Sequence, residues 1–374
     1  MQQTLLTGML LMMVTMQPAF AEPVAPDVYR RTVFIGDSIT DGDTYPQLVR
    51  SALDDAKKPP MIAINSGIGG DTAAGMLKRL DRDVLVHRPT LGTFNAGAND
   101  ALRGVPVADY ERDVRAIAER LKKEGIPMIL LTPNVLAGAM KEKGQANLDA
   151  YELVLRSIAS EYGLRLAEVN KAQTAAETAG EAQLSEDNLH PNHAGQRSIA
   201  RAVLDAMGYS DVAVPARAHL TVTPGIIPQW QAKPIPRQPA ITDGDVAAVK
   251  PDDTWTAIHL PETDICSDEW LDDLRIRGAS LTLRKVFPKE NTFLVAGHVD
   301  LNEAKTLYIH PACEVSRAWL NGKPIYVHSP DAWTGYHIGR VSVPVEFHKG
   351  DNLLIMETGP IFFMSLADKP LFSD

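Results

Sequence analysis

Apolar runs and amphipathic stretches alternate along residues 31–208. Short apolar runs bounded by glycine or polar residues predict buried strands, whereas apolar residues at helical spacing over 109–123 and 148–162 predict helices. The second of these helices is expected to end at Gly163, and a final helix is expected over about 192–207. The predicted strands are 32–35, 61–65, 91–95, 128–132 and 164–169. Strands that alternate with helices of this length predict a parallel sheet covered by helices on both faces.

The pattern changes after about residue 212. Six prolines between residues 212 and 239 interrupt any long element, so this segment predicts an extended linker or a strap that lies along a surface. From about Asp243 onward, short β-like runs are separated by turn residues, and Asn321-Gly322 is a strong hairpin signal. Many short strands without helices predict an all-β jelly roll or β-sandwich. The predicted strands are 281–286, 292–296, 306–309, 315–320, 341–345 and 353–358.

Chain length and charge limit the domain number and the partners. A chain of 374 residues is long for one domain, so two are expected. We predict a signal peptide over 1–21, an α/β domain over 22–210, a proline-rich linker over 211–242 and a β-sandwich over 243–374. The net charge of −10 argues against nucleic acid as a partner, because nucleic acid requires a basic face.

The N-terminus has the features of an export signal. Residues 5–14 are almost wholly apolar, and Ala19-Phe20-Ala21 offers a small-x-small cleavage site, although no Lys or Arg precedes it. The apolar run is shorter than the ~20 residues of a membrane span, so no stable membrane insertion is expected. We predict cleavage after Ala21 and a periplasmic or secreted protein. The two cysteines, Cys266 and Cys313, are compatible with a disulfide and equally with two buried thiols.

Candidate chemistry begins where the first predicted strand ends, at Gly36-Asp37-Ser38. In open α/β sheets, ligands bind beyond the carboxyl ends of the strands, so Ser38 is a candidate nucleophile. Segments 65–72 and 95–100 follow the second and third strands, and 187–192 precedes the final helix. All of these segments can therefore meet at one edge of the sheet.

A serine hydroxyl is a weak nucleophile unless a neighbouring base takes its proton. His190 is the candidate base, because the unperturbed pKa of a histidine, about 6.5, lies near working pH. Asp187, three residues earlier, can accept a hydrogen bond from the other ring nitrogen. The backbone N–H groups of Ser38 and Gly70 and the side-chain amide of Asn99 are candidate donors to a tetrahedral oxyanion.

Taken together, these residues resemble the SGNH (GDSL-type) hydrolase family of esterases. Gly36-Asp37-Ser38, Gly70, Gly97-x-Asn99-Asp100 and Asp187-x-x-His190 are similar to its four sequence blocks and occur in the family's order over about 31–208. The resemblance implies a flavodoxin-like three-layer α/β/α sandwich. It also implies a Ser38–His190–Asp187 triad, with Ser38, Gly70 and Asn99 forming the oxyanion hole.

Simpler interpretations exist for each block. Ser38 is compatible with a plain helix cap, and Asp37 is expected to hold the loops rather than to catalyse. The glycines at 67–70 suggest a phosphate turn, but Thr72 occupies the place of its third glycine. His190, His193 and Asp187 suggest zinc, but a further ligand is absent from the strand-end loops of this domain. We therefore expect no cofactor and no metal.

The C-terminal part is rich in aromatic residues that are compatible with a sugar-stacking platform or, equally, with a core. Its turns at 319–322 and 350–353 resemble those of galactose-binding-like jelly-roll domains attached to glycoside-active enzymes. The resemblance implies either carbohydrate binding or support of the enzyme. The aromatic residues are Trp255, Trp270, Trp319, Trp333 and Tyr336.

The sequence thus predicts an exported serine esterase that removes acetyl groups from a carbohydrate. The alternative substrates are short-chain lipid esters, lysophospholipids and thioesters. A second alternative, from another class, is a carbohydrate-binding protein with an inactive esterase fold. That alternative predicts a missing catalytic residue, and every block residue is present.

Overall fold

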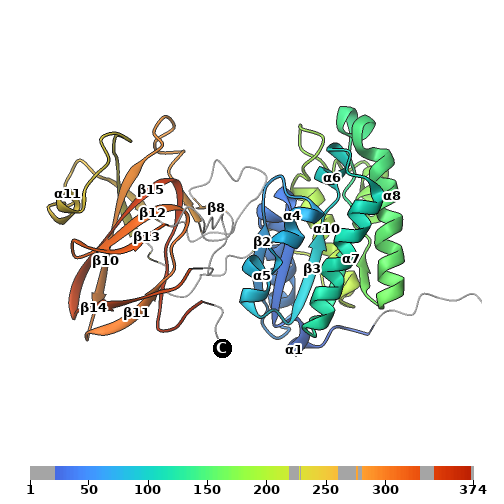
Figure 1. Cartoon of the computed structure of the whole chain (residues 1–374), viewed down its shortest axis with the longest axis horizontal. Coiled ribbons are helices and arrows are strands. Elements are labelled where there is room, and N and C mark those ends of the chain that lie inside the picture. Colours follow the sequence, from blue (N-terminus) through green and yellow to red (C-terminus); the bar gives the residue numbers. More distant parts are fainter. Residues whose placement is uncertain are drawn as a thin grey trace, which may run out of the picture.

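The computed structural model describes residues 22–218, 227, 229–259, 275–276, 280–328 and 341–371. Figure 1 shows an α/β domain, coloured blue to green, and a separate all-β domain, coloured yellow to red. The predicted signal peptide and Cys266 lie outside the described residues. None of the helices within these ranges combines the length and the hydropathy that a membrane span requires.

A five-stranded parallel sheet forms the centre of the α/β domain, which confirms the predicted fold class. The strand order is β2-β1-β3-β4-β5. This order reverses between β1 and β3, so the crevice beyond the carboxyl ends of these two strands is the expected ligand site. The bounds are β1 Arg31–Gly36, β2 Ile62–Gly67, β3 Leu91–Asn95, β4 Met128–Leu131 and β5 Arg165–Ala167.

Helices cover both faces of this sheet (Figure 1). Phe34 points into one apolar core, and its neighbours Val33 and Ile35 point into the other, because successive strand residues face opposite sides. The Phe34 face is covered by α3 (Thr44–Asp55), α9 (Val169–Thr178) and α10 (His193–Ala206). The opposite face is covered by α4 (Ala73–Lys78), α7 (Val107–Lys123) and α8 (Gly138–Tyr162).

One helix is longer than predicted, because α8 begins at Gly138 rather than at 148. Its first turns have little apolar periodicity and are held by tertiary packing. A Cβ atom at Gly144 would lie 3.1 Å from Leu136 Cδ1 and 3.3 Å from Leu102 Cδ2. The remaining short helices are α1 (Pro26–Tyr29), α2 (Ser38–Asp41), α5 (Leu80–Asp83), α6 (Ala98–Leu102) and the 3₁₀-helix η1 (Leu85–His87).

The all-β domain has antiparallel sheets, as predicted. One sheet has the order β13-β12-β15-β10-β6-β7, with β9 pairing to β15 and β8 to β9; the other has the order β14-β11-β16. Side chains from both sheets share one apolar core. The bounds are β6 Gln229–Pro234, β7 Thr256–His259, β8 Arg275–Ile276, β9 Ser280–Thr282, β10 Phe293–Leu301, β11 Lys305–Ile309, β12 Ala312–Leu320, β13 Lys323–Val327, β14 Val343–Phe347, β15 Gly350–Phe363 and β16 Leu366–Ala367, with the short helix α11 at Asp243–Ala247.

The predicted hairpin is present between β12 and β13. Leu320 pairs with Lys323, and both intervening residues, Asn321 and Gly322, have positive φ (51° and 78°). Two residues of positive φ form the type I′ turn that matches the twist of the flanking strands.

The prediction of a linker over 211–242 is wrong for part of its length. Residues Gln229–Pro234 form β6, which pairs with β10 on one side and β7 on the other. The polar residues Gln229, Gln231 and Lys233 alternate with Trp230 and Ala232, which are buried. Pro228 precedes this strand in the sequence and Pro234 is its last residue. Because prolines are typical of linkers, the alternation of polar and apolar residues was not recognised as a strand.

Two of the aromatic residues considered for sugar stacking belong to a core. Trp255 and Trp319 are buried in the same apolar cluster. The indole Nε1 of Trp319 donates to Asp243 Oδ1 at 2.8 Å, so even its polar atom has an internal partner. The stacking interpretation is therefore wrong for these two residues. Trp270, Trp333 and Tyr336 lie outside the described residues.

Candidate active site

The turn after β1 places a serine hydroxyl at the strand-order reversal. The chain passes from Gly36 to α2, which begins at Ser38. A Cβ atom at Gly36 would lie 2.0 Å from Thr40 Oγ1, so only glycine fits here. Asp37 is the N-cap of α2, and its Oδ1 accepts a hydrogen bond from Ile39 N at 3.0 Å. This agrees with the structural role expected of Asp37.

The loop before α10 holds its own acid and base in fixed positions. Asp187 Oδ1 accepts the backbone N–H groups of Leu189 and His190 at 3.0 and 2.9 Å. Asn188, which lies between Asp187 and Leu189, adopts a positive φ of 61°. The backbone of Ala137 also donates to Asn188 O at 3.1 Å, which ties this loop to the segment after β4.

Ser38, His190 and Asp187 form one continuous hydrogen-bond chain. Ser38 Oγ lies 2.7 Å from His190 Nε2, and His190 Nδ1 lies 2.5 Å from Asp187 Oδ2. The side chains of His190 and Asp187 are 40% and 50% exposed. A hydroxyl, an imidazole and a carboxylate in this order can activate the hydroxyl as a nucleophile.

The electrostatics of Asp187 favour its ionised form. Partial burial by itself would raise the pKa of this carboxyl group. The hydrogen bonds from the His190 ring and from the two backbone N–H groups outweigh burial, and they lower the pKa below its usual value. A carboxylate that stays ionised can hold the His190 ring with Nδ1–H toward it and Nε2 toward Ser38.

Gly70 occupies a turn that exposes its backbone N–H. Asp71 N donates to Ile68 O at 3.1 Å, and Gly70, the third residue of this turn, has a φ of +77°. These features define a type II turn, which requires positive φ at its third position. Within the described residues, neither the Gly70 N–H nor the Ser38 N–H donates a hydrogen bond to a protein acceptor. Both groups are therefore available to a ligand.

Asn99 is held by the same aspartate that caps α2. Its Nδ2 donates to Asp37 Oδ2 at 3.1 Å, which fixes the orientation of the amide. The second hydrogen on Nδ2 stays available to a ligand. Asp37 is fully buried, and burial raises the pKa of its carboxyl group to about 7.

Three further residues support these loops, and two of them, Arg79 and Arg103, were not predicted for that role. Arg79 is buried and donates to Gly36 O, Ser66 O, Ser66 Oγ and Asp71 Oδ2. Arg103 donates to Gly70 O at 2.6 Å. Asp100 accepts Ala73 N at the start of α4, at 3.1 Å. Asp100 carried a sequence signal, because it adjoins Asn99 in the third sequence block, whereas nothing in the sequence linked Arg79 or Arg103 to these loops.

Metal binding finds no support in the described part of the chain. No group of three or more His, Cys, Asp and Glu side chains suited to a metal ion occurs there. His193 begins α10, as expected, and its Nε2 lies 2.6 Å from Ala216 O. It is therefore engaged away from His190.

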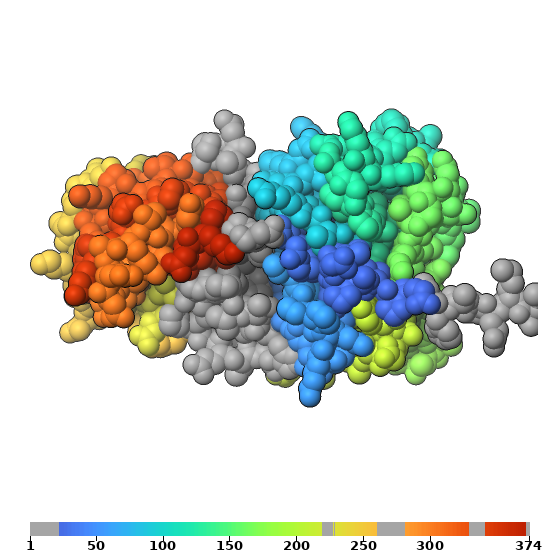
Figure 2. All heavy atoms as spheres, turned by 90° about the horizontal axis from the view of Figure 1, so that it is seen from below, coloured from blue at the N-terminus to red at the C-terminus, as the bar shows by residue number. Residues whose placement is uncertain are grey.

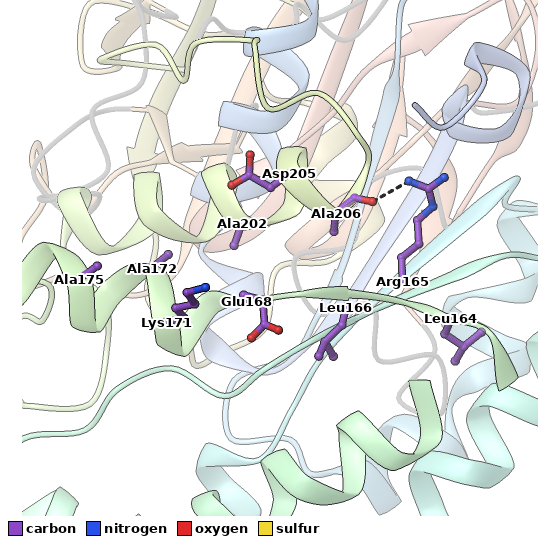
Figure 3. A pocket seen from close by; sticks show the side chains of 10 residues that line it. All are labelled: Leu164, Arg165, Leu166, Glu168, Lys171, Ala172, Ala175, Ala202, Asp205 and Ala206. Atoms are coloured by element: carbon purple, nitrogen blue, oxygen red, sulfur yellow. Dashed lines mark hydrogen bonds between the residues drawn. The ribbon is translucent and has the colours of Figure 1, made fainter. Parts of the chain in front are cut away.

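Two cavities of the α/β domain lie away from this site. The larger one, of about 600 Å³, is lined by β5, α9 and α10, and Figure 3 shows Arg165 bonded across it to the carbonyl of Ala206. The second is lined by residues at the amino ends of β3, β4 and β5. Figure 2 shows the face that carries the N-terminal residues, in dark blue, at that end of the domain. Neither cavity contains Ser38, His190 or Asp187.

Comparison with known proteins identifies the α/β domain. Residues 34–198 match the GDSL-like Lipase/Acylhydrolase family. The α/β domain is a GDSL-like lipase/acylhydrolase domain, and the chain is a carboxylic ester hydrolase. An acetylxylan esterase of Geobacillus stearothermophilus is 28% identical to this esterase over 207 residues, which are 48% of this chain and 94% of that protein. Esterase TesA of Pseudomonas aeruginosa is 30% identical over 137 residues, 35% of this chain and 64% of that protein.

A solved structure also aligns with the GDSL-like domain. The acetylxylan esterase Axe2 from Geobacillus stearothermophilus is 25% identical and has a TM-score of 0.46; the alignment covers 50% of this chain and 97% of Axe2.

Proposed function

We propose that this protein is an exported serine esterase that removes acetyl groups from a carbohydrate. Ser38 is the nucleophile, His190 the general base and acid, and Asp187 the residue that orients His190. The observation that carries this proposal is the hydrogen-bond chain from Ser38 Oγ through His190 to Asp187, with distances of 2.7 and 2.5 Å. The proposal needs no cofactor and no metal.

The first half of the reaction acylates Ser38. Oγ bonds to the ester carbonyl carbon while its proton passes to His190 Nε2. Negative charge develops on the carbonyl oxygen, which the N–H groups of Ser38 and Gly70 and Nδ2 of Asn99 stabilise. The bond from the carbonyl carbon to the alcohol oxygen then breaks, and His190 gives its proton to the departing alcohol.

The second half releases the acid. A water molecule attacks the carbonyl carbon of acyl-Ser38 while His190 takes a proton from it. The same three donors hold the second oxyanion. When the bond to Ser38 Oγ breaks, the proton on His190 returns to Oγ and the free enzyme is restored.

The exposure of this site favours a large alcohol part. The His190 and Asp187 side chains are 40% and 50% exposed, so the rim on that side is open to a bulky sugar chain. The similarity to an acetylxylan esterase, over nearly the whole of that relative, supports an acetylated glycan as substrate. The apolar segment over 5–14 and the small residues at 19–21 support export. Carbohydrate binding by the all-β domain stays a prediction.

Hydrolysis of p-nitrophenyl esters of increasing acyl length tests the reaction class and the acyl preference. We expect kcat/KM to be highest for acetate and to fall as the acyl chain lengthens. A maximum at octanoate or longer would favour the lipid or thioester alternative.

Acetate release from acetylated xylan then tests the alcohol part. Ser38→Ala is the inactive variant, and Ser185→Ala is its control, because Ser185 is an exposed serine on the loop that carries His190. We expect acetate from the wild-type protein and from Ser185→Ala only. Hydrolysis of p-nitrophenyl acetate without any acetate from acetylated glycans would contradict the glycan assignment and leave the esterase assignment intact.

A further inference from the structure

Arg103 joins the two segments that carry the proposed oxyanion donors. It is the C-cap of α6, and its backbone N donates to Asn99 O at 3.1 Å, one helical turn away. Its side chain extends to the neighbouring loop, where Nη2 donates to Gly70 O at 2.6 Å. Arg103 thus contacts the Asn99 segment through its backbone and the Gly70 turn through its guanidinium.

The Gly70 turn, residues 68–71, is held by contacts at both ends and has few contacts at its central residues. At one end Ile68 N donates to Gly36 O at 3.0 Å, and at the other Asp71 pairs with Arg79 at 2.7 Å. The two central residues, Gly69 and Gly70, have no side chains and maximal backbone freedom. Within the described residues, the Arg103 guanidinium is the side-chain donor that reaches this central part of the turn.

The guanidinium has no carboxylate partner in the described part of the chain. Arg103 is exposed, and no Asp or Glu oxygen there lies within ion-pair distance of it. A Cβ atom at Gly70 would lie 3.4 Å from its Nη2, so the cation lies directly against the turn. Its hydrogen bond to a backbone carbonyl is charge-assisted, which makes the bond stronger than one between neutral groups.

We propose that Arg103 is a positioning residue for the oxyanion site. Its guanidinium holds the Gly70 turn at a fixed distance from α6, so that the Gly70 N–H and Asn99 Nδ2 converge on one oxygen. The inference rests on the proposed function, because it needs Gly70 and Asn99 as oxyanion donors. Displacement of a reacting group by about 1 Å can cost roughly 100-fold in rate, so loss of this contact should be measurable.

Steady-state kinetics of Arg103→Met and Arg103→Lys on p-nitrophenyl acetate test the proposal. Met keeps the aliphatic stem and removes the donor, so we expect kcat to fall roughly 10- to 100-fold with KM within about twofold of the wild type. Lys keeps a charged donor, so we expect it to recover part of the loss. Added guanidinium ion should restore part of kcat to Arg103→Ala and should leave the wild-type rate unchanged.

A transition-state mimic supplies a second readout. A boronic acid that forms a tetrahedral adduct places an oxygen in the oxyanion site, so its affinity for Arg103→Met should fall in parallel with kcat. Arg88→Ala is the matched control, because Arg88 is also exposed and lies before β3, at the opposite end of the sheet. Melting temperatures of all variants show whether each one is folded.

The outcomes separate this inference from the proposed function. If Ser38→Ala is inactive and Arg103→Met has the same kcat as the control Arg88→Ala, the positioning role is wrong. The esterase mechanism then stands. A loss confined to KM would also overturn the positioning role, because it would place Arg103 in substrate binding. If Ser38→Ala keeps wild-type activity, the proposed function itself fails.

Discussion

Asp37 and Asn99, which belong to two different strand-end loops, share a partly buried hydrogen bond of 3.1 Å between Oδ2 and Nδ2. The other carboxylate oxygen of Asp37 caps the helix that begins at Ser38. One buried carboxylate therefore sets both the start of α2, which carries Ser38, and the orientation of the Asn99 amide. This relationship explains why an aspartate precedes the serine, although it takes no part in proton transfer.

Asp37→Asn should reduce activity through Asn99. The new Nδ2 group at position 37 would face Nδ2 of Asn99, so one of the two amides must rotate. If Asn99 rotates, the oxyanion loses a donor, and removing one such donor typically lowers kcat about 100- to 1000-fold. We expect a fall in kcat with little change in KM. Activity equal to that of the wild type would contradict the link between Asp37 and Asn99.

The same substitution should change how stability depends on pH. Burial raises the pKa of Asp37 to about 7 in the folded protein, from 3.8 in the unfolded chain. Between these values the folded state holds a proton that the unfolded state has lost, so stability is lost as pH rises from about 4 to 7. The loss is on the order of 4 kcal/mol.

Urea denaturation at several pH values measures this effect. The wild type and Asp37→Asn should differ in the slope of unfolding free energy against pH, because Asn cannot ionise. The slope of the variant should be less negative between pH 4 and pH 7. Parallel curves for the two proteins would show that the pKa of Asp37 is not raised.

Arg79 should be a major contributor to the stability of the α/β domain. Its side chain is 6% exposed, and it pairs with Asp71, 12% exposed, and Asp83, 0% exposed. Replacement by Met leaves these groups and two strand-end carbonyls without this donor, so we expect a loss of about 3–5 kcal/mol in unfolding free energy. Arg120→Met is the control, because its ion pairs are exposed and should contribute below about 1 kcal/mol. Equal melting temperatures for the two variants would contradict this role.

Gly70→Ala and Gly104→Ala form a matched pair. Both positions have positive φ, +77° and +68°, so alanine is strained at each by about 1 kcal/mol. The methyl group at 70 meets Arg103 Nη2 at 3.4 Å, whereas nothing lies within 4 Å at 104. We expect similar losses of stability, but a fall in kcat only for Gly70→Ala. Similar kcat values for both variants would argue against Gly70 as a donor.

Trp319 should be a core residue rather than a sugar platform. It is 1% exposed, and Arg317 lies over its ring at 4.9 Å. Trp319→Phe should therefore lower the melting temperature of the all-β domain, because it removes the hydrogen bond to Asp243 and part of the buried area. Affinity electrophoresis in acetylated xylan should show the same retardation for variant and wild type. Weaker retardation of a fully folded variant would assign Trp319 to the sugar surface.

The sequence predicted those features of the α/β domain whose local hydrophobic pattern matches their burial in the fold. The five strands of the α/β domain are continuous apolar runs, because both sheet faces are buried. Ser38, Gly70, Asn99 and the Asp187–His190 pair all follow strands or precede a helix. Their convergence could therefore be predicted, although hydrogen-bond distances could not.

The features that the sequence did not predict depend on contacts with other parts of the chain. Arg79 lies between α4 and α5, and its acceptors include carbonyls at the ends of β1 and β2. The first turns of α8 are held by packing around Gly144. Strand β6 lies among prolines, and only its pairing with β10 and β7 identifies it as a strand. Such elements are specified by the assembled fold rather than by local periodicity.

The central claim is that Ser38 attacks the substrate and becomes acylated. Mass-spectrometric mapping of the adduct formed with a fluorophosphonate, which reacts with activated serine hydroxyls, tests it most directly. We predict one stoichiometric adduct on Ser38, its absence in Ser38→Ala, and strongly reduced labelling in His190→Ala, because the hydroxyl then has no base. Labelling of another serine, or undiminished ester hydrolysis by Ser38→Ala, would contradict the account.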